Sequence, residues 1–268
     1  MSPAVDLYNG AYSNYEVEVY REIRVETYGV DLGQTSWVNT EESNEIPQAL
    51  SLTPESYVLE IGCGSGRYAL RVAETVGCRV VGVDINEPGI QTANQLATAL
   101  NMSAQLHFER CDVSMALPFE DAKFDAAFAN DVLCHIPQRL QVLGELFRVV
   151  RPGGRMLFSD ALIIGGMISQ QEIAARSSIG YYIFSPPGEN ERMMERVGFQ
   201  VVSVRDTSDN AASIAKRWRE AREARREALN AVEGATNFEG LQQFLGSVQI
   251  LCGEGRLRRY LYIAQKPA

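Results

Sequence analysis

The sequence has no apolar run long enough to cross a bilayer, and no basic segment followed by an apolar stretch near its N-terminus. Its five cysteines are an odd number without a Cys-x-x-Cys pair, which fits neither a disulfide framework nor a zinc site. Basic residues are also few, because 25 Lys and Arg stand against 34 Asp and Glu. The resulting net charge of −9 opposes phosphate binding. We therefore expect a soluble cytoplasmic protein with reduced thiols, no metal site, and no membrane or nucleic-acid partner.

The length and composition are those of one α/β domain with elaborations. The 268 residues, 46% of them apolar, can bury a substantial single core. We predict an N-terminal helical lid over residues 1–50 and a main domain over residues 51–268. Within the main domain, residues 161–195 and 207–246 are predicted cap or insertion segments, the second of them helical. A monomer or a homodimer is expected.

The N-terminal region is rich in tyrosine and predicts two helices. Residues 12–28 contain neither Gly nor Pro and are predicted to form the first helix. Residues 29–40 are polar apart from Trp37 and resemble a loop, after which residues 41–50 predict a short helix capped by Thr40.

Beyond residue 54, short apolar runs alternate with helical ones, the pattern of parallel strands joined by crossover helices. Pro152-Gly153-Gly154 predicts a turn. Residues 212–233 predict a charged helix whose Glu and Arg residues interleave, which favours a solvated surface over a nucleic-acid face. Strands are predicted at residues 57–61, 79–83, 105–110, 124–129, 155–158, 198–204 and 257–264, and further helices at 68–76, 88–100 and 139–149.

A glycine-rich turn follows the first predicted strand at once. The strand YVLEI runs into Gly62-Cys63-Gly64-Ser65-Gly66, and a helix comes next. Such a turn lets a ligand approach free backbone N–H groups at a helix N-terminus. The spacing is G-x-G-x-G rather than the G-x-G-x-x-G of dinucleotide-binding folds. Glu60 lies two residues before the first glycine, where a carboxylate repels a pyrophosphate but suits an amino group.

Two further acids end the second and third strands. Asp84 follows Val83, at the distance from the glycines where ribose-binding carboxylates sit, and Asp112 lies in the run RCDV. The carboxyl ends of neighbouring strands line one crevice in a doubly wound sheet, so Glu60, Asp84 and Asp112 should converge. Any one of them alone is also explained as a turn or cap residue.

With EIGCGSG, VDI, CDV, NDVLCHI and RPGGRMLFSD in this order, the sequence resembles the class I S-adenosylmethionine-dependent methyltransferases. The resemblance implies a Rossmann-like, seven-stranded, doubly wound sheet in the order 3-2-1-4-5-7-6, with strand 7 antiparallel. It also implies S-adenosylmethionine as the cofactor. By the same resemblance, Glu60, Gly62 and Gly64 contact its methionine half, Asp84 its ribose, Ile85, Val113 and Asp112 its adenine, and Asn130 its amino-acid group or the methyl-transfer region.

The N-terminal segment and residues 168–190 are similar to those of the small-molecule members, such as sarcosine, quinone and natural-product methyltransferases. In those relatives an N-terminal helix closes over the cofactor. Gln34, Ser36 and Trp37 are the candidates for this gate, with Trp37 toward the cofactor and Gln34 toward the acceptor. Trp37 also serves as a packing anchor in an alternative interpretation. Candidate walls of the acceptor pocket are Tyr181, Tyr182 and Phe184, which core packing explains equally well.

Methyl transfer from a sulfonium is an in-line displacement that needs no metal and no covalent enzyme intermediate. A general base helps when the acceptor must lose a proton. His107 lies in mid-strand and is predicted to face solvent, whereas His135 lies just past the fourth strand, where the acceptor pocket should open. His135 is therefore the candidate base or orienting group, with Asp131 and Asp160 as weaker candidates.

These observations favour transfer of a methyl group to N, O or C of a small-molecule acceptor. A nicotinamide-dependent oxidoreductase would share the glycine loop and the ribose acid, but G-x-G-x-G and Glu60 count against it. A methyltransferase-like binding module without catalysis is the other alternative.

Overall fold

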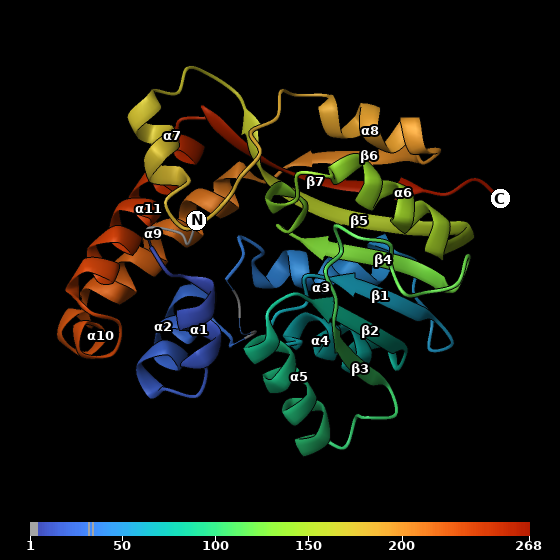
Figure 1. Cartoon of the computed structure of the whole chain (residues 1–268), viewed down its shortest axis with the longest axis horizontal. Coiled ribbons are helices and arrows are strands. Elements are labelled where there is room, and N and C mark those ends of the chain that lie inside the picture. The colour runs from blue at the N-terminus through green and yellow to red at the C-terminus, as the bar shows by residue number, and fades with distance from the viewer. Residues whose placement is uncertain (1–4, 32, 34) are drawn as a thin grey trace.

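The computed structural model describes residues 5–31, 33 and 35–268. Seven strands form one sheet in the order β3-β2-β1-β4-β5-β7-β6 (Figure 1). β7 runs antiparallel to both of its neighbours, and the pairs among the first five strands are parallel. The predicted sheet is thus confirmed, including its order and its reversed last strand. The strands are β1 (Tyr57–Ile61), β2 (Arg79–Asp84), β3 (Leu106–Arg110), β4 (Phe124–Asn130), β5 (Val150–Ile164), β6 (Gln200–Asp206) and β7 (Leu257–Gln265).

Helices cover both faces of the sheet because successive strand side chains point to opposite faces. On β1, Val58 joins the core beneath α3 (Thr40–Ala49), α4 (Arg67–Val76) and α5 (Glu87–Ala99). Its neighbour Leu59 faces the other way and packs in the core beneath α6 (Arg139–Val149) and α8 (Glu189–Val197). The sheet is therefore closed to solvent except at its ends and edges.

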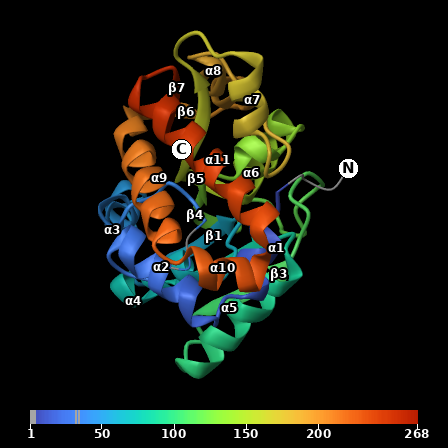
Figure 2. The same ribbon diagram turned by 90° about the vertical axis from the view of Figure 1, so that its left-hand side faces the viewer.

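A third hydrophobic core joins helices from both ends of the chain. It contains α2 (Glu18–Tyr28), α9 (Ser208–Glu223), α10 (Arg226–Glu233) and α11 (Ala235–Gly253), with α1 (Tyr8–Ser13) and α7 (Gln170–Arg176) beside them. We call these six helices the cap. They lie together beyond one end of the sheet, and Figure 2 is turned so that they face the viewer. The predicted domain division at residue 50 remains a prediction.

The helix predicted over residues 12–28 is wrong in its extent, because the chain breaks between α1 and α2. Asn14 donates its side-chain amide to the Gly10 carbonyl oxygen at 2.9 Å, and Val17 is extended, so the turn does not continue. The N-cap of α3 is Asn39 rather than Thr40, and its side chain accepts from the Glu42 N–H at 2.8 Å.

Other boundaries differ in the second half of the chain. β5 runs from Val150 to Ile164, so the predicted turn at Pro152-Gly153-Gly154 lies inside the strand. This segment falls where the register with β4 shifts, between Val150 and Arg155, and pairing with β7 begins at Arg155. Gly153 has φ 77° there. The charged helix predicted over 212–233 is two helices, α9 and α10, and α11 was not predicted. The other predicted strands and helices of the sheet domain begin and end within two residues of the observed ones.

Within the described chain, no helix combines the length and apolarity needed to cross a membrane. The same residues contain no cluster of three or more His, Cys, Asp or Glu side chains placed to hold a metal ion. All five cysteines are free thiols.

Candidate active site

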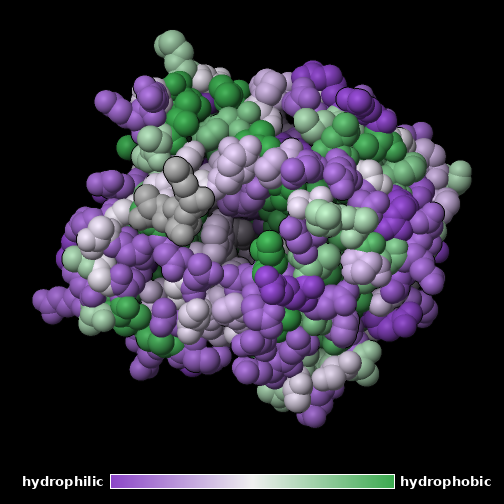
Figure 3. Space-filling model, in the orientation of Figure 1, coloured by the Kyte–Doolittle hydropathy of each residue, from purple (hydrophilic) through white to green (hydrophobic). Residues whose placement is uncertain are grey.

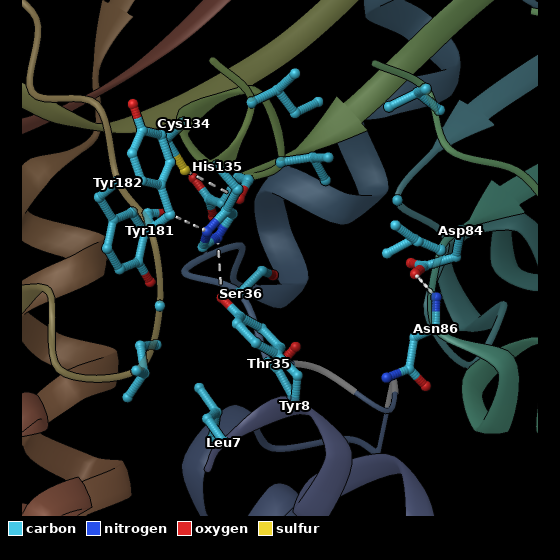
Figure 4. Close-up of a pocket in the computed structure, with 18 of the residues that line it drawn as sticks. Leu7, Tyr8, Thr35, Ser36, Asp84, Asn86, Cys134, His135, Tyr181 and Tyr182 are labelled. Carbon is cyan, nitrogen blue, oxygen red and sulfur yellow. Dashed lines mark hydrogen bonds between the residues drawn. The ribbon is translucent and has the colours of Figure 1, made fainter. Parts of the chain in front are cut away.

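A cavity of 460 Å³ opens between the carboxyl ends of the strands and the cap. It corresponds to the hollow at the centre of the face shown in Figure 3, and its size is typical of small-molecule sites. Asp84 lies on one side and His135 on the opposite side (Figure 4). We call these two sides the Asp84 side and the His135 side.

The glycine loop on the Asp84 side has a conformation that excludes other residues. Gly62 and Gly64 have φ of 69° and 52°, in the left-handed region. A Cβ on Gly62 would lie 2.2 Å from a methyl group of Val132, and one on Gly64 would lie 2.3 Å from the hydroxyl of Tyr12. The loop backbone is thus held close to the segment that follows β4 and to α1.

Asp84 organises this loop. Its carboxylate accepts the Gly64 N–H and the Asn86 N–H, each at 2.8 Å. Burial raises the pKa of the Asp84 carboxyl, and the backbone donors oppose that effect. The carboxylate lines the cavity, as the position after β2 predicts.

Two buried polar side chains near the loop each have one atom without a hydrogen-bond partner among the described residues. Glu60 is 1% exposed, and its Oε2 accepts the Ala69 N–H at 3.1 Å while Oε1 has no hydrogen bond. Burial raises the pKa of Glu60 well above its usual range. The Nδ2 of Asn130, at the end of β4, is likewise unpaired. Since unpaired buried polar atoms are costly, both atoms fit a site completed by a polar ligand.

Some of the other residues predicted to bind the cofactor also line the cavity, and others do not. Ile85, Asp112 and Val113 line the Asp84 side of the cavity, and Asp112 also caps its own turn by accepting from the Ser114 N–H at 3.0 Å. Trp37 is buried and lines the cavity. Glu60 and Gly64 do not line the cavity in this structure.

His135 lies in a short turn after β4 and is held by two hydrogen bonds. Its Nδ1 is 3.1 Å from the Tyr181 carbonyl oxygen, and its Nε2 is 3.0 Å from the Tyr8 hydroxyl (Figure 4). A carbonyl oxygen can only accept, so Nδ1 carries the proton and Nε2 accepts from Tyr8. The ring of Tyr182 packs against His135 with the centroids 4.4 Å apart.

The pKa of His135 is lowered to about 4, mainly because burial disfavours the charged imidazolium and also because Arg176 is cationic. The Tyr181 carbonyl works in the opposite direction. At neutral pH His135 is therefore uncharged, with a basic nitrogen turned toward a hydroxyl at the cavity.

Asp131 and Asp160, the weaker candidates for orienting the acceptor, are both engaged by partners inside the protein. Asp131 lines the cavity, but its oxygens accept from the Trp37 N–H, the Ser159 hydroxyl and the Arg259 guanidinium. Asp160 is 0% exposed and does not line the cavity, because it pairs with Arg139 at 2.7 Å. Their sequence positions at strand ends do not reveal that an arginine from elsewhere in the chain pairs with each of them.

Two of the three residues predicted to wall the acceptor pocket line the cavity, and the third does not. Tyr181 and Tyr182 line the cavity on the His135 side, whereas Phe184 packs against the cap core. Gln34 lies outside the described residues. Ser36 lines the cavity and shares a hydrogen bond of 2.9 Å with Tyr68. His107 is on the surface, with a side chain 68% exposed.

Among the lining residues that sequence reasoning missed, four belong to cap helices: Tyr8, Tyr12, Arg176 and Phe244. The density of tyrosines near the N-terminus was the only available signal for the first two. Nothing local marks Arg176 or Phe244, because they reach the cavity through the packing of α7 and α11.

A family profile described as a methyltransferase domain matches residues 59–158. An O-methyltransferase of Aspergillus sclerotiorum is 30% identical over 68% of this chain and 70% of its own length. The 27-O-demethylrifamycin SV methyltransferase of Amycolatopsis mediterranei is 31% identical over 81% of this chain and 80% of its own length.

Among solved structures, the fold is similar to a phosphoethanolamine N-methyltransferase 2 of Haemonchus contortus bound to S-adenosyl-L-methionine. That similarity has a TM-score of 0.79 at 21% identity and covers 96% of this chain and 60% of that one. A sarcosine dimethylglycine methyltransferase from Galdieria sulphuraria, described as putative, gives 0.77 at 15% identity over 84% and 82% of the two chains.

Proposed function

Because this chain belongs to the class I S-adenosylmethionine-dependent methyltransferases that act on small molecules, we propose that it methylates a hydroxyl oxygen of its acceptor. Membership of this family argues against the nicotinamide-dependent alternative and against a binding module without catalysis. The two relatives compared above at 30% identity or more include an enzyme named as an O-methyltransferase. That name supports oxygen as the acceptor atom.

The Asp84 side fits the cofactor. S-adenosylmethionine supplies an activated methyl group on a sulfonium. In our proposal, the methionine half lies against Gly62 and the unpaired amide of Asn130, with Glu60 and Gly64 directly behind this wall of the cavity. Asp84 binds the ribose, and Ile85, Asp112 and Val113 surround the adenine. Trp37 and α1 cover the site as a gate.

The observation that carries oxygen transfer is the pairing of His135 Nε2 with the Tyr8 hydroxyl at 3.0 Å. The Nε2 of His135 already accepts a hydrogen bond from a hydroxyl at the cavity, so the hydroxyl of an acceptor can take the place of the Tyr8 hydroxyl. His135 then takes the proton as the oxygen gains the methyl group, and the Tyr181 carbonyl stabilises the imidazolium through Nδ1. Tyr181 and Tyr182 form the acceptor walls, whereas Phe184 and Asp160 have no direct role.

The position of the new bond tests this proposal. We expect that incubation with trideuteromethyl S-adenosylmethionine and paired hydroxyl and amino compounds, such as a catechol and its aniline analogue, labels oxygen only. Mass spectrometry measures the label, and NMR locates it. Each turnover should release one S-adenosylhomocysteine. Methyl groups found on nitrogen or carbon, with the hydroxyl compounds unmodified, would overturn transfer to oxygen.

Asp84→Ala is expected to weaken S-adenosylmethionine binding by about 1–3 kcal/mol, roughly 5- to 150-fold in Kd. The variant loses the hydrogen bonds to the ligand, and it also loses those that hold the Gly64 and Asn86 N–H groups. Calorimetry measures the affinity. Asp121→Ala is the matched control, because Asp121 is 79% exposed and lies outside the cavity. Equal affinities of the two variants would remove Asp84 from the site.

A further inference from the structure

Arg176 differs from the other buried arginines of the described chain. Four of the five pair with a carboxylate, as Arg24 with Asp31, Arg139 with Asp160, Arg222 with Glu233 and Arg259 with Glu42 and Asp131. Arg176 is 1% exposed and has no carboxylate partner among the described residues. Its Nε and Nη1 are also without hydrogen bonds. A buried cation without a counterion is strongly disfavoured.

Aromatic rings surround this cation. The Cζ of Arg176 lies 4.4 Å from the ring centroid of Tyr182, 5.1 Å from that of Phe244 and 5.9 Å from that of Trp37. Cation–π contacts offset part of the cost of desolvation, but they do not satisfy the N–H groups. Arg176 is therefore held in place while two of its nitrogens, Nε and Nη1, have no hydrogen-bond partner.

Arg176 lies at the cavity described above, on the side of His135. It lines the same cavity as His135, and Tyr182 contacts both side chains. The other charged residues that line the cavity are Asp84, Asp112 and Asp131, and Asp131 is paired with Arg259. On the His135 side, Arg176 is thus the one formal charge without a counterion among the described lining residues.

We propose that Arg176 binds an anionic group of the acceptor, a carboxylate or a phosphate, beside the hydroxyl that faces His135. The planar guanidinium suits both groups because it can form two parallel hydrogen bonds to them. This inference rests on the proposed function for the assignment of the His135 side to the acceptor. It narrows the substrate class from hydroxyl compounds to hydroxyl compounds that carry a fixed negative charge.

Thermal unfolding with saturating S-adenosylhomocysteine tests the proposal with three matched probes: 4-hydroxybenzoate, 4-hydroxyphenyl phosphate and the neutral 4-hydroxybenzamide. We expect at least one anion to raise the Tm of the native protein by several degrees more than the amide does. The arm that responds identifies the anion. In Arg176→Met this preference should vanish while the affinity for S-adenosylhomocysteine stays within about twofold. Equal effects of all three probes on the native protein, or a preference that survives in Arg176→Met, would overturn the proposal.

Stability without an acceptor separates a binding role from a structural one. Arg176→Met removes an uncompensated charge and should leave the Tm unchanged or raise it. The matched control is Arg139→Met, which strands the buried Asp160 and should lower the Tm by roughly 10 °C. A comparable loss in Arg176→Met would show that Arg176 is structural and overturn the proposal. Methyl transfer to nitrogen with the anion preference intact would instead contradict only the proposed acceptor atom.

Discussion

Replacing His135 with glutamine is expected to lower turnover by about 10²–10⁴-fold while leaving the affinity for S-adenosylmethionine unchanged. Glutamine can still donate to the Tyr181 carbonyl and contact Tyr8, but it cannot take a proton from an acceptor hydroxyl. Single-turnover kinetics with a hydroxyl acceptor and calorimetry with the cofactor measure the two quantities.

The only other histidine provides the matched control. His107→Gln changes an exposed side chain on β3, outside the cavity, and should leave both turnover and affinity unchanged. Turnover of His135→Gln within about threefold of the native value would contradict a role as base. Parallel loss of turnover and cofactor affinity would instead indicate that His135 supports the loop.

The pH profile of kcat/KM tests the role and the charge state of His135 independently. Protonated His135 cannot accept a proton, so activity should fall as the pH drops through its pKa. Burial lowers that pKa to about 4, so native activity should lack the decline near pH 6.5 that an ordinary histidine would produce. A decline centred near pH 6.5 would contradict the buried, neutral state. Besides burial, the groups that act on this pKa are Tyr181, Arg176, Asp131 and Arg139. Tyr8 and Tyr182 also face the ring, through a hydrogen bond and by packing.

Replacing Arg259 with methionine is expected to destabilise the protein by about 3–5 kcal/mol. Arg259 lies on β7 and is 0% exposed. Its Nη1 donates to both carboxylate oxygens of Glu42, at 3.0 and 2.9 Å, and its Nε donates to Asp131 at 2.9 Å. The substitution leaves two buried carboxylates without their cation. Asp131 also accepts the Trp37 N–H, so the substitution should also loosen the segment that we propose as the gate.

Arg258, the residue next to Arg259, provides the control for this prediction. Arg258 pairs with Asp206 at 2.7 Å, but both side chains are partly exposed, at 41% and 38%. Arg258→Met should therefore cost no more than about 1 kcal/mol. Urea unfolding of the two variants measures the difference. Losses of equal size would show that the buried Arg259 network contributes no more to stability than the exposed pair.

The residues at the carboxyl ends of the strands could be predicted because the end of each strand depends on the local sequence pattern. The alternation of short apolar runs with helices predicts parallel strands, and the family resemblance places β1, β2 and β4 side by side, so that their carboxyl ends meet at one edge. Gly62 follows β1, Asp84 ends β2 and His135 lies in the turn after β4, so their convergence on one cavity follows from topology. The glycine spacing and Glu60 then distinguished the expected cofactor from a dinucleotide.

The cap could not be predicted in this way. Its core combines α2 with α9 and α11, which are far apart in the chain, and no periodicity within one helix specifies the partner that it will meet. For the same reason, Asp131 and Asp160 were indistinguishable from catalytic acids until Arg259 and Arg139 were found beside them.

The sequence by itself determined the sheet, its strand order through family resemblance, and the residues that follow each strand, because short-range pattern and turn chemistry carry that information. Only the tertiary structure decided which charges are paired and which are available. Burial and the neighbours of a side chain determine its pKa and its free donors, and both depend on distant segments. His135 is neutral and Arg176 is unpaired because α1, α7 and α11 close over the end of the sheet.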